Sequence, residues 1–406
     1  MTNFFLQFKQ RVHNISDIEL DYLNALKLED RAETWDYLDQ NLVLSTEEKW
    51  KYYQENCILL NNFGSIVAEI NQTNIQMILQ GCRKTVQLLN ILSIITDPQE
   101  RFEIASYLLR LFDLIINSNL IQRVIALLDY SSYPHIQWEA EKIITFFAPG
   151  PRIAHTPEDS LFHPKKLTTK AILINGGAVQ KLLALLKSPC LEVKEQALLA
   201  LGFIARHDKE AKDVVITLKA VDALLSTLSG TKLDSVIKKA TWTLSILCGA
   251  TLPKDATLKS KDDMIKILTT VVTLLFTSNN PEVITNVIGI SKYLLPLMEI
   301  KEDNMNVWER LVQMLSFPNH IIKRSALSAV QKILELSDVQ TQFMIECGLL
   351  GQLGELLMNQ NQDVRIDTCS ALVYLARKGY SWVSFNLSNI VYNGFEYIFY
   401  IVQIDL

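Results

Sequence analysis

Few side chains of this chain lie at spacings that catalysis or metal binding requires. The densest group falls in residues 149–170, which contain His155, Glu158, Asp159 and His163. Imidazole and carboxylate groups can bind zinc, but the spacing of these four matches no standard ligand pattern. Four prolines in the same stretch favour an extended chain between them. The pattern therefore favours a looped-out insertion over a metal site.

The other residue types that could perform catalysis are scattered. The six cysteines lie far apart without a CxxC pair, which argues against a zinc site and against a disulfide framework. No motif of the form GxGxxG, GxxxxGK(S/T), HExxH or GxSxG occurs. No histidine stands at a spacing from a cysteine or serine that would indicate an activated nucleophile. We expect a protein that is not an enzyme and that holds no cofactor or metal.

Composition and charge narrow the function further. Of the 406 residues 49% are hydrophobic and only 14 are glycine, which allows a large core without a turn-rich β architecture. The net charge of −5 argues against a nucleic-acid or anionic-membrane surface. No apolar run approaches the roughly 18–20 residues of a membrane-spanning helix, and the first residues lack the apolar stretch of a signal peptide. We expect a soluble, intracellular protein of the cytoplasm and/or nucleus.

The clearest structural element is the stretch of residues 176–206, which predicts two helices in tandem. In the first, Val179, Leu182 and Leu186 follow the spacing of one helical face, and Pro189 ends the helix because it has no amide hydrogen. The second helix carries apolar side chains at Val193, Ala197, Leu198, Leu201, Ile204 and Ala205. Such a pair is apolar on more than one side, so further copies must stack against it.

Copies of the second helix recur along the chain. The equivalents of Val193, which we call the heads, are Ile136, Val193, Val236, Val283, Ile322 and Val364. Four places after the heads stand Ala140, Ala197, Ala240, Val287, Ala326 and Thr368, and twelve places after them stand Ala148, Ala205, Cys248, Leu295, Leu334 and Ala376. Successive heads are 57, 43, 47, 39 and 42 residues apart, and the first spacing is longer because the insertion 149–170 intervenes. A helical period of about 40–47 residues is typical of armadillo or HEAT arrays.

Four blocks of this array resemble successive repeats of the importin-α family. They are SSYPHIQWEAEKIITFFA, GGAVQKLLALLKSPCLEVKEQALLALGFIA, KKATWTLSILCGA and SDVQTQFMIECGLL, in that order along the chain. The resemblance covers roughly Ser65 to Lys378 and implies an all-α chain folded as a right-handed α-α superhelix, the armadillo-repeat solenoid. We expect repeats over residues 64–377, with insertions near 98–118 and 149–170. Residues 378–406 would cap the last repeat, because an array must cover its exposed end.

The resemblance also implies a groove for nuclear-localisation peptides, lined by the third helix of each repeat. In the family a tryptophan and an asparagine recur there four residues apart; the indole flanks a Lys or Arg and the amide holds the peptide backbone. The tryptophan positions of this chain are Lys142, Leu199, Trp242, Gly289, Ser328 and Ser370. The asparagine positions are Phe146, Phe203, Ile246, Tyr293, Lys332 and Tyr374, and His207 stands where an acid would follow Phe203. Only Trp242 keeps the family's residue type.

Four of the six former asparagine positions are therefore aromatic. These rings could form a replacement groove for an apolar helix or a proline-containing segment. They could instead pack between adjacent third helices or under another subunit, and we favour that interpretation. Trp242 is correspondingly interpreted as a packing residue. The predicted partner-groove residues are Lys142, Phe146, Leu199, Phe203, His207, Trp242, Ile246, Tyr293 and Tyr374.

Residues 1–63 differ from the rest of the chain. They contain 11 acids and 6 bases and no basic run, so the basic segment by which the family binds importin-β has no counterpart here. We expect this acidic helical extension to cap the first repeat, with a separate partner-binding role as the alternative.

Two functions remain from the sequence. The first is a non-enzymatic scaffold, a structural subunit of a larger assembly that holds protein partners through the concave groove and possibly the apolar C-terminal end. The second is a divergent nuclear-import adaptor that binds nuclear-localisation-type peptides in that groove. Loss of the Trp/Asn ladder favours the scaffold, and the ordered resemblance along the repeats favours the adaptor.

Overall fold

A computed structural model describes residues 59–94, 114–148, 171–206, 209–249, 261–300 and 305–377. Several predicted features lie outside the described residues. They are the insertion 149–170, the C-terminal cap 378–406, His207, and most of the N-terminal extension and of residues 98–118. Every regular element in the described ranges is a helix, which confirms the all-α class. The described residues fall into two compact units, one that ends at Leu247 and one that begins at Cys248.

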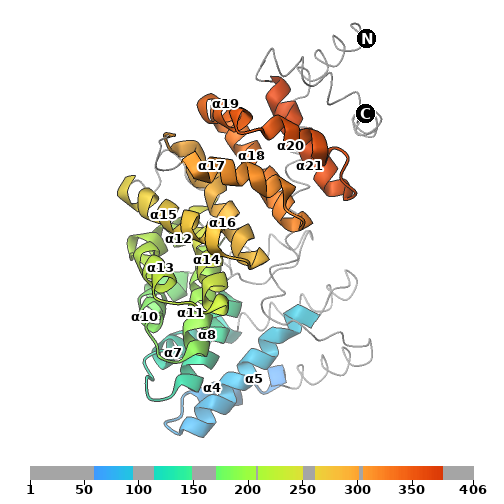
Figure 1. Cartoon of the computed structure of the whole chain (residues 1–406). Coiled ribbons are helices and arrows are strands. Elements are labelled where there is room, and N and C mark those ends of the chain that lie inside the picture. Colours follow the sequence, from blue (N-terminus) through green and yellow to red (C-terminus); the bar gives the residue numbers. More distant parts are fainter. Residues whose placement is uncertain are drawn as a thin grey trace. The chain divides into compact units, whose positions relative to one another are not determined.

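The first unit is built from short helices that each precede a longer one (Figure 1). Its helices are α4 (Phe63–Ile70), α5 (Ile75–Ile94), α7 (Leu120–Leu127), α8 (Pro134–Phe147), α10 (Ala178–Leu185), α11 (Leu191–Ala205), α12 (Lys209–Thr217), α13 (Ala220–Ser229) and α14 (Asp234–Cys248). The long helices α5, α8 and α11 pack against one another in chain order, so each repeat contacts the next.

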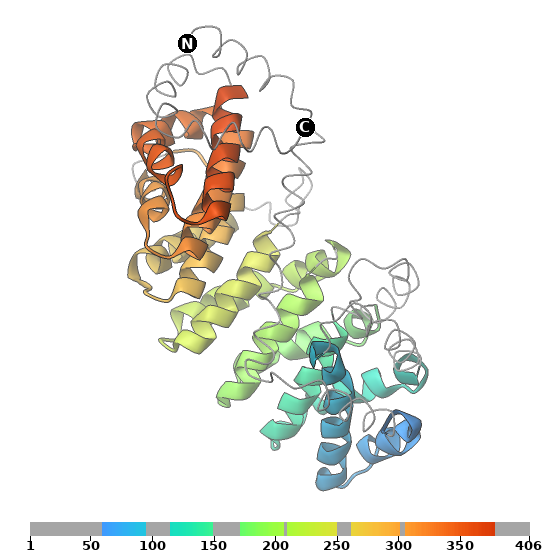
Figure 2. The ribbon, with the colours of Figure 1, turned by 90° about the vertical axis from the view of Figure 1, so that its right-hand side faces the viewer.

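The elements of the second unit are α15 (Lys261–Thr277), α16 (Pro281–Leu294), η2 (Leu295–Leu297), α17 (Met305–Gln313), η3 (Met314–Ser316), α18 (His320–Leu336), α19 (Asp338–Glu346), α20 (Leu349–Leu356) and α21 (Gln362–Arg377). In this unit α18 and α21 likewise follow shorter helices, whereas α15, with 17 residues, is longer than α16, with 14 (Figure 2). Here α16, α18 and α21 pack in chain order. We call α5, α8, α11, α14, α16, α18 and α21 the third helices.

Local sequence explains where these helices begin. The side chains of Asn280 and Asn319 accept hydrogen bonds from the first amides of α16 and α18, which supplies partners that a helix start lacks. The turns before α10 and α20 each contain a glycine at positive φ, Gly177 at 78° and Gly348 at 90°. Glycine adopts this left-handed backbone without steric penalty, so both turns are tight.

The heads and the residues four and twelve places after them are core positions. All six heads and all six residues four places later are buried, with none more than 1% exposed. Twelve places after the heads, the five residues from Ala148 to Leu334 are fully buried, and the exposure of Ala376 is not among the described values. The period read from the sequence therefore coincides with the spacing of buried contacts, as stacking of like units requires.

One buried side chain departs from this apolar pattern. Glu141 of α8 is fully buried, and neither of its carboxyl oxygens has a hydrogen-bond partner among the residues that the structure describes. Burial raises the pKa of this carboxyl well above its usual range, since a charged group loses its hydration in the core. Five places after four of the other five heads the core carries Leu198, Thr241, Ile288 and Leu327, all fully buried, and after Val364 stands the half-buried Cys369. Glu141 therefore occupies a site built for an uncharged side chain.

We predict that Glu141→Leu raises the free energy of unfolding at neutral pH by about 1–3 kcal/mol, because an unpaired buried polar group is removed. The folded state keeps the Glu141 proton that the unfolded chain releases above about pH 4. Glu141 therefore favours folding fully only below that pH, and this contribution is lost as pH rises through the raised folded pKa.

Denaturant unfolding of both proteins across a pH series measures this effect. The stability gap between variant and wild type should widen as pH rises. A gap that is independent of pH would contradict the assignment.

Candidate protein-binding face on the third helices

The predicted groove residues that the structure describes lie on third helices of both units. Lys142 and Phe146 lie on α8, Leu199 and Phe203 on α11, Trp242 and Ile246 on α14, Tyr293 on α16 and Tyr374 on α21. Members of a pair are four residues apart, so they stand one turn above each other. Their exposure varies. In the first unit Phe146, Leu199, Phe203 and Trp242 are only 3–6% exposed. Lys142 and Ile246 of that unit are half-buried, as are Tyr293 and Tyr374 of the second.

Trp242 packs against the neighbouring repeat. Its ring lies 5.0 Å from the Phe203 ring, centroid to centroid, with the planes tilted by 54°. A Cβ atom built on Gly202 would come within 2.3 Å of Trp242 Cζ3, so the indole sits directly on the backbone of α11. Gly202 is therefore required for the close approach of the two helices. Neighbouring residues cover the indole ring, and only 6% of Trp242 remains exposed to solvent.

Lys142 is held by residues of its own repeat. Its Nζ lies 3.8 Å from the centroid of the Trp138 ring and 2.7 Å from Glu139 Oε2. The other carboxylate oxygen of Glu139 lies 3.6 Å from Nε of Arg83 on α5. The side chain of Glu139 is only 5% exposed, so a buried carboxylate sits between two cations from adjacent third helices. Sequence reasoning about the groove missed both Trp138 and this carboxylate.

Charge pairs recur between neighbouring third helices at equivalent places. Glu195 of α11 pairs with Lys239 of α14, and these residues stand two and three places after their heads. Arg324 of α18 and Asp367 of α21 stand at the same two places, with Nε and Oδ2 3.2 Å apart. Complementary charges at fixed places in adjacent repeats were visible in the sequence and could have indicated these pairs.

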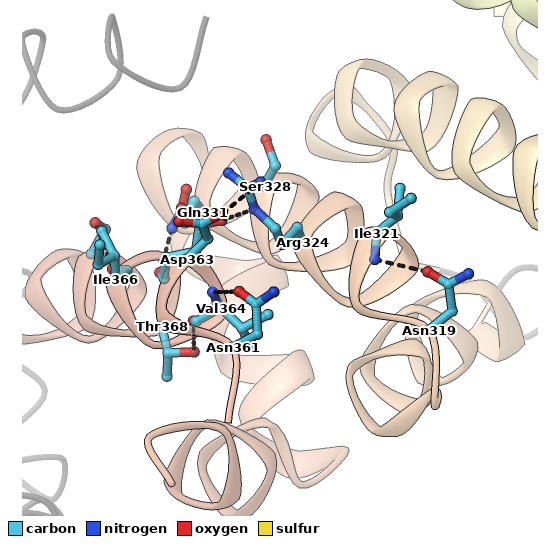
Figure 3. A network of polar contacts seen from close by, with 12 residues as sticks. Asn319, Ile321, Arg324, Ser328, Gln331, Asn361, Asp363, Val364, Ile366 and Thr368 are labelled. Carbon is cyan, nitrogen blue, oxygen red and sulfur yellow. Dashed lines mark hydrogen bonds and ion pairs between the residues drawn. The ribbon is translucent and has the colours of Figure 1, made fainter. Parts of the chain in front are cut away.

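Buried polar groups form a second set of links between repeats. Gln196 donates to the Thr145 hydroxyl at 2.8 Å, and Thr243 donates to the Leu198 carbonyl at 2.7 Å. In the second unit the Gln331 amide donates to the Asp367 carbonyl at 2.6 Å, beside the Arg324 pair (Figure 3). Each bond joins one third helix to the next. The polar atoms along this face therefore hold the stack in register, because a buried donor without its acceptor is destabilising.

The remaining chemistry of the described residues is sparse. Burial raises the pKa of the Cys82 thiol to about 12 and that of Cys369 to about 11, so neither is a thiolate near neutral pH. Within the described ranges no group of three or more His, Cys, Asp or Glu side chains is arranged to hold a metal ion. A search of the same ranges found no helix with the length and apolar character to cross a membrane.

Comparison with known proteins places this geometry in a family context. Residues 337–377, which span α19, α20 and α21, match the Armadillo/beta-catenin-like repeat. Importin subunit alpha-1b of Oryza sativa subsp. japonica is 29% identical over 260 residues, which cover 63% of this chain and 45% of that protein. Importin subunit alpha-3 of Arabidopsis thaliana is 26% identical over 266 residues, with the same two shares. The chain thus spans about half the length of these curated relatives.

Solved structures show a related fold. The crystal structure of an engineered protein is 20% identical and superposes with a TM-score of 0.51, covering 64% of this chain and 98% of that chain. A designed armadillo repeat protein in complex with the peptide (KR)4 is 20% identical with a TM-score of 0.49, over 63% of this chain and 99% of the other. The likeness to the first of these structures concerns the fold alone. Residues 337–377 are thus similar to an armadillo repeat, and about 63% of the chain is similar to importin α subunits.

We predict that Gly202→Ala lowers the free energy of unfolding by about 1–3 kcal/mol, because the added methyl group overlaps the Trp242 ring. Chemical denaturation followed by circular dichroism measures the change. The matched control is Gly289→Ala in the interior of α16, where an added Cβ meets no atom within 4 Å. That control should raise stability by up to about 1 kcal/mol through helix propensity. Stabilisation by both changes would contradict the close packing of Trp242 on α11.

Proposed function

We propose that this importin-α-like armadillo-repeat protein is a non-enzymatic scaffold, a structural subunit that holds protein partners in a larger intracellular assembly. The observation that carries the proposal is the packing of Trp242 on Gly202 and Phe203 of the preceding third helix. A tryptophan that binds a peptide lysine or arginine needs an open ring face. Here the ring is used between repeats.

The neighbouring residues support the same proposal. Phe146 and Phe203 are buried and carry no group that could hydrogen-bond an extended peptide backbone. Lys142 brings a positive charge to the face, and like charge repels a basic peptide. The polar atoms of Glu195 and Lys239 are paired with each other across two repeats. A third-helix face with these contacts suits permanent stacking better than the reversible capture of a cationic segment.

A divergent nuclear-import adaptor is the second candidate. Similarity to proteins named importin subunit alpha, over 63% of this chain, favours it. The half-buried Tyr293 and Tyr374 of the second unit leave more of the third-helix face open than their counterparts Phe146 and Phe203. An adaptor using the second unit would offer the Tyr293 hydroxyl in place of an amide.

Binding of a labelled Lys/Arg-rich peptide at physiological salt tests the two candidates. We predict no saturable binding to the full chain, because the described third helices present no open indole face at Trp242. Physiological salt matters because it screens non-specific attraction beyond about 8 Å. The scaffold should instead co-purify with other subunits in constant proportion. Micromolar binding that disappears in Tyr293→Ala, while the variant keeps the circular dichroism spectrum of the wild type, would establish the adaptor and exclude the scaffold.

A further inference from the structure

The junction between α5 and α8 carries an excess of positive charge. The single carboxylate of Glu139 faces both the Arg83 guanidinium, at 3.6 Å, and the Lys142 ammonium, at 2.7 Å. Two cations thus share one anion. The adjacent pair of Lys84 and Glu69, with Nζ and Oε1 2.5 Å apart, is balanced in itself. Within this group of described residues one positive charge is therefore left uncompensated.

An equivalent junction in the second unit shows what a compensated arginine looks like. Arg324 of α18 pairs with Asp367, which stands three places after the head Val364. Arg83 pairs in the same way with Glu139, three places after the head Ile136. In addition, Nη1 of Arg324 lies 3.3 Å from Asp363 Oδ2, so its guanidinium faces two carboxylates (Figure 3). Asp363 stands four places before Asp367. The residue four places before Glu139 on α8 is His135. The second carboxylate of this arrangement is therefore not provided at α8.

The Arg83 guanidinium is also open to a ligand. The side chain is 64% exposed, compared with 25% for Arg324. Its Nε lies 3.6 Å from Glu139 Oε1, and most of the side chain remains exposed to solvent. Arginine binds carboxylates through two parallel hydrogen bonds along one edge of its guanidinium. The Lys142 ammonium pairs with the same carboxylate and lies over the half-buried Trp138 ring, which adds an aromatic group to this cationic surface.

We infer that the surface formed by Arg83, Trp138 and Lys142 docks an acidic segment of a protein partner, with a partner carboxylate placed at the Arg83 guanidinium. This inference rests on the proposed scaffold function and names the chemical class of one partner. The occupant is acidic because charge complementarity decides which segment the surface attracts and in which register it docks. A basic segment would face Lys142 and Arg83 and be repelled.

Fluorescence anisotropy with the full chain tests the inference. The probe is a labelled peptide of alternating glutamate and serine, and its glutamine analogue is the uncharged control. We expect the acidic peptide to bind and the analogue not to bind. Arg83→Gln and Lys142→Gln should each weaken binding about tenfold, in keeping with loss of a charge-assisted contact. Arg83→Lys, which keeps the charge and removes the fork, should weaken binding by a smaller factor.

A matched variant separates this site from general charge effects. Lys187→Gln removes one positive charge from the exposed turn after α10 and should leave the affinity unchanged. Equal weakening by Lys187→Gln, or equal binding of a single-stranded oligonucleotide, would overturn the inference. Circular dichroism melting checks that each variant is folded, and Lys142→Met, which keeps an aliphatic chain over Trp138, replaces Lys142→Gln if that variant is unstable.

The outcomes also separate the inference from the function on which it rests. Failure of the acidic peptide to bind, while other subunits still co-purify with the chain, would overturn the inference alone. Saturable binding of a Lys/Arg-rich peptide would overturn the proposed function as well.

Discussion

Contact between successive third helices is the constraint on which the rest of the structure depends. Each helical repeat is apolar on more than one side and cannot bury itself, so it is stable only against its neighbours. The heads Val193 and Val236, and the residues four and twelve places after each, supply the apolar part of this contact, and all of them are buried. The pair of Glu195 with Lys239 and the bond from Gln196 to Thr145 supply its polar part. Because these side chains of the third helices contact the next repeat, fewer of them can contact a ligand.

Sequence reasoning recovered the apolar part of the fold. Because stacked repeats bury the same places in each copy, the spacing of Ile136, Val193 and Val283 was sufficient to locate the core. It could not locate Glu141, because a carboxyl at a core place looks like a surface residue until its neighbours are known. The left-handed backbone of Lys219, at φ 63°, was equally hidden, since its residue type gives no signal of the kind that Gly177 gives.

The candidate site was predicted less completely than the fold. Helical spacing places Phe203 and Trp242 on third helices, but it does not say whether a ring points to solvent or onto the next helix. That choice depended on Gly202, whose missing side chain lets the indole reach the backbone of α11. The role of Trp138 was missed because it stands four residues before Lys142, outside the places that the family resemblance singles out. Contacts between repeats decide both cases, and a single repeat does not contain them.

The stability of Trp242→Ala tests the central claim most directly, namely that this side chain joins repeats. Denaturant unfolding of the full chain is the measurement. If the indole fills the contact between α11 and α14, its removal lowers the free energy of unfolding by about 3–5 kcal/mol, as expected for a buried tryptophan. A change within about 0.5 kcal/mol of wild type, the range of an ordinary surface substitution, would contradict the account.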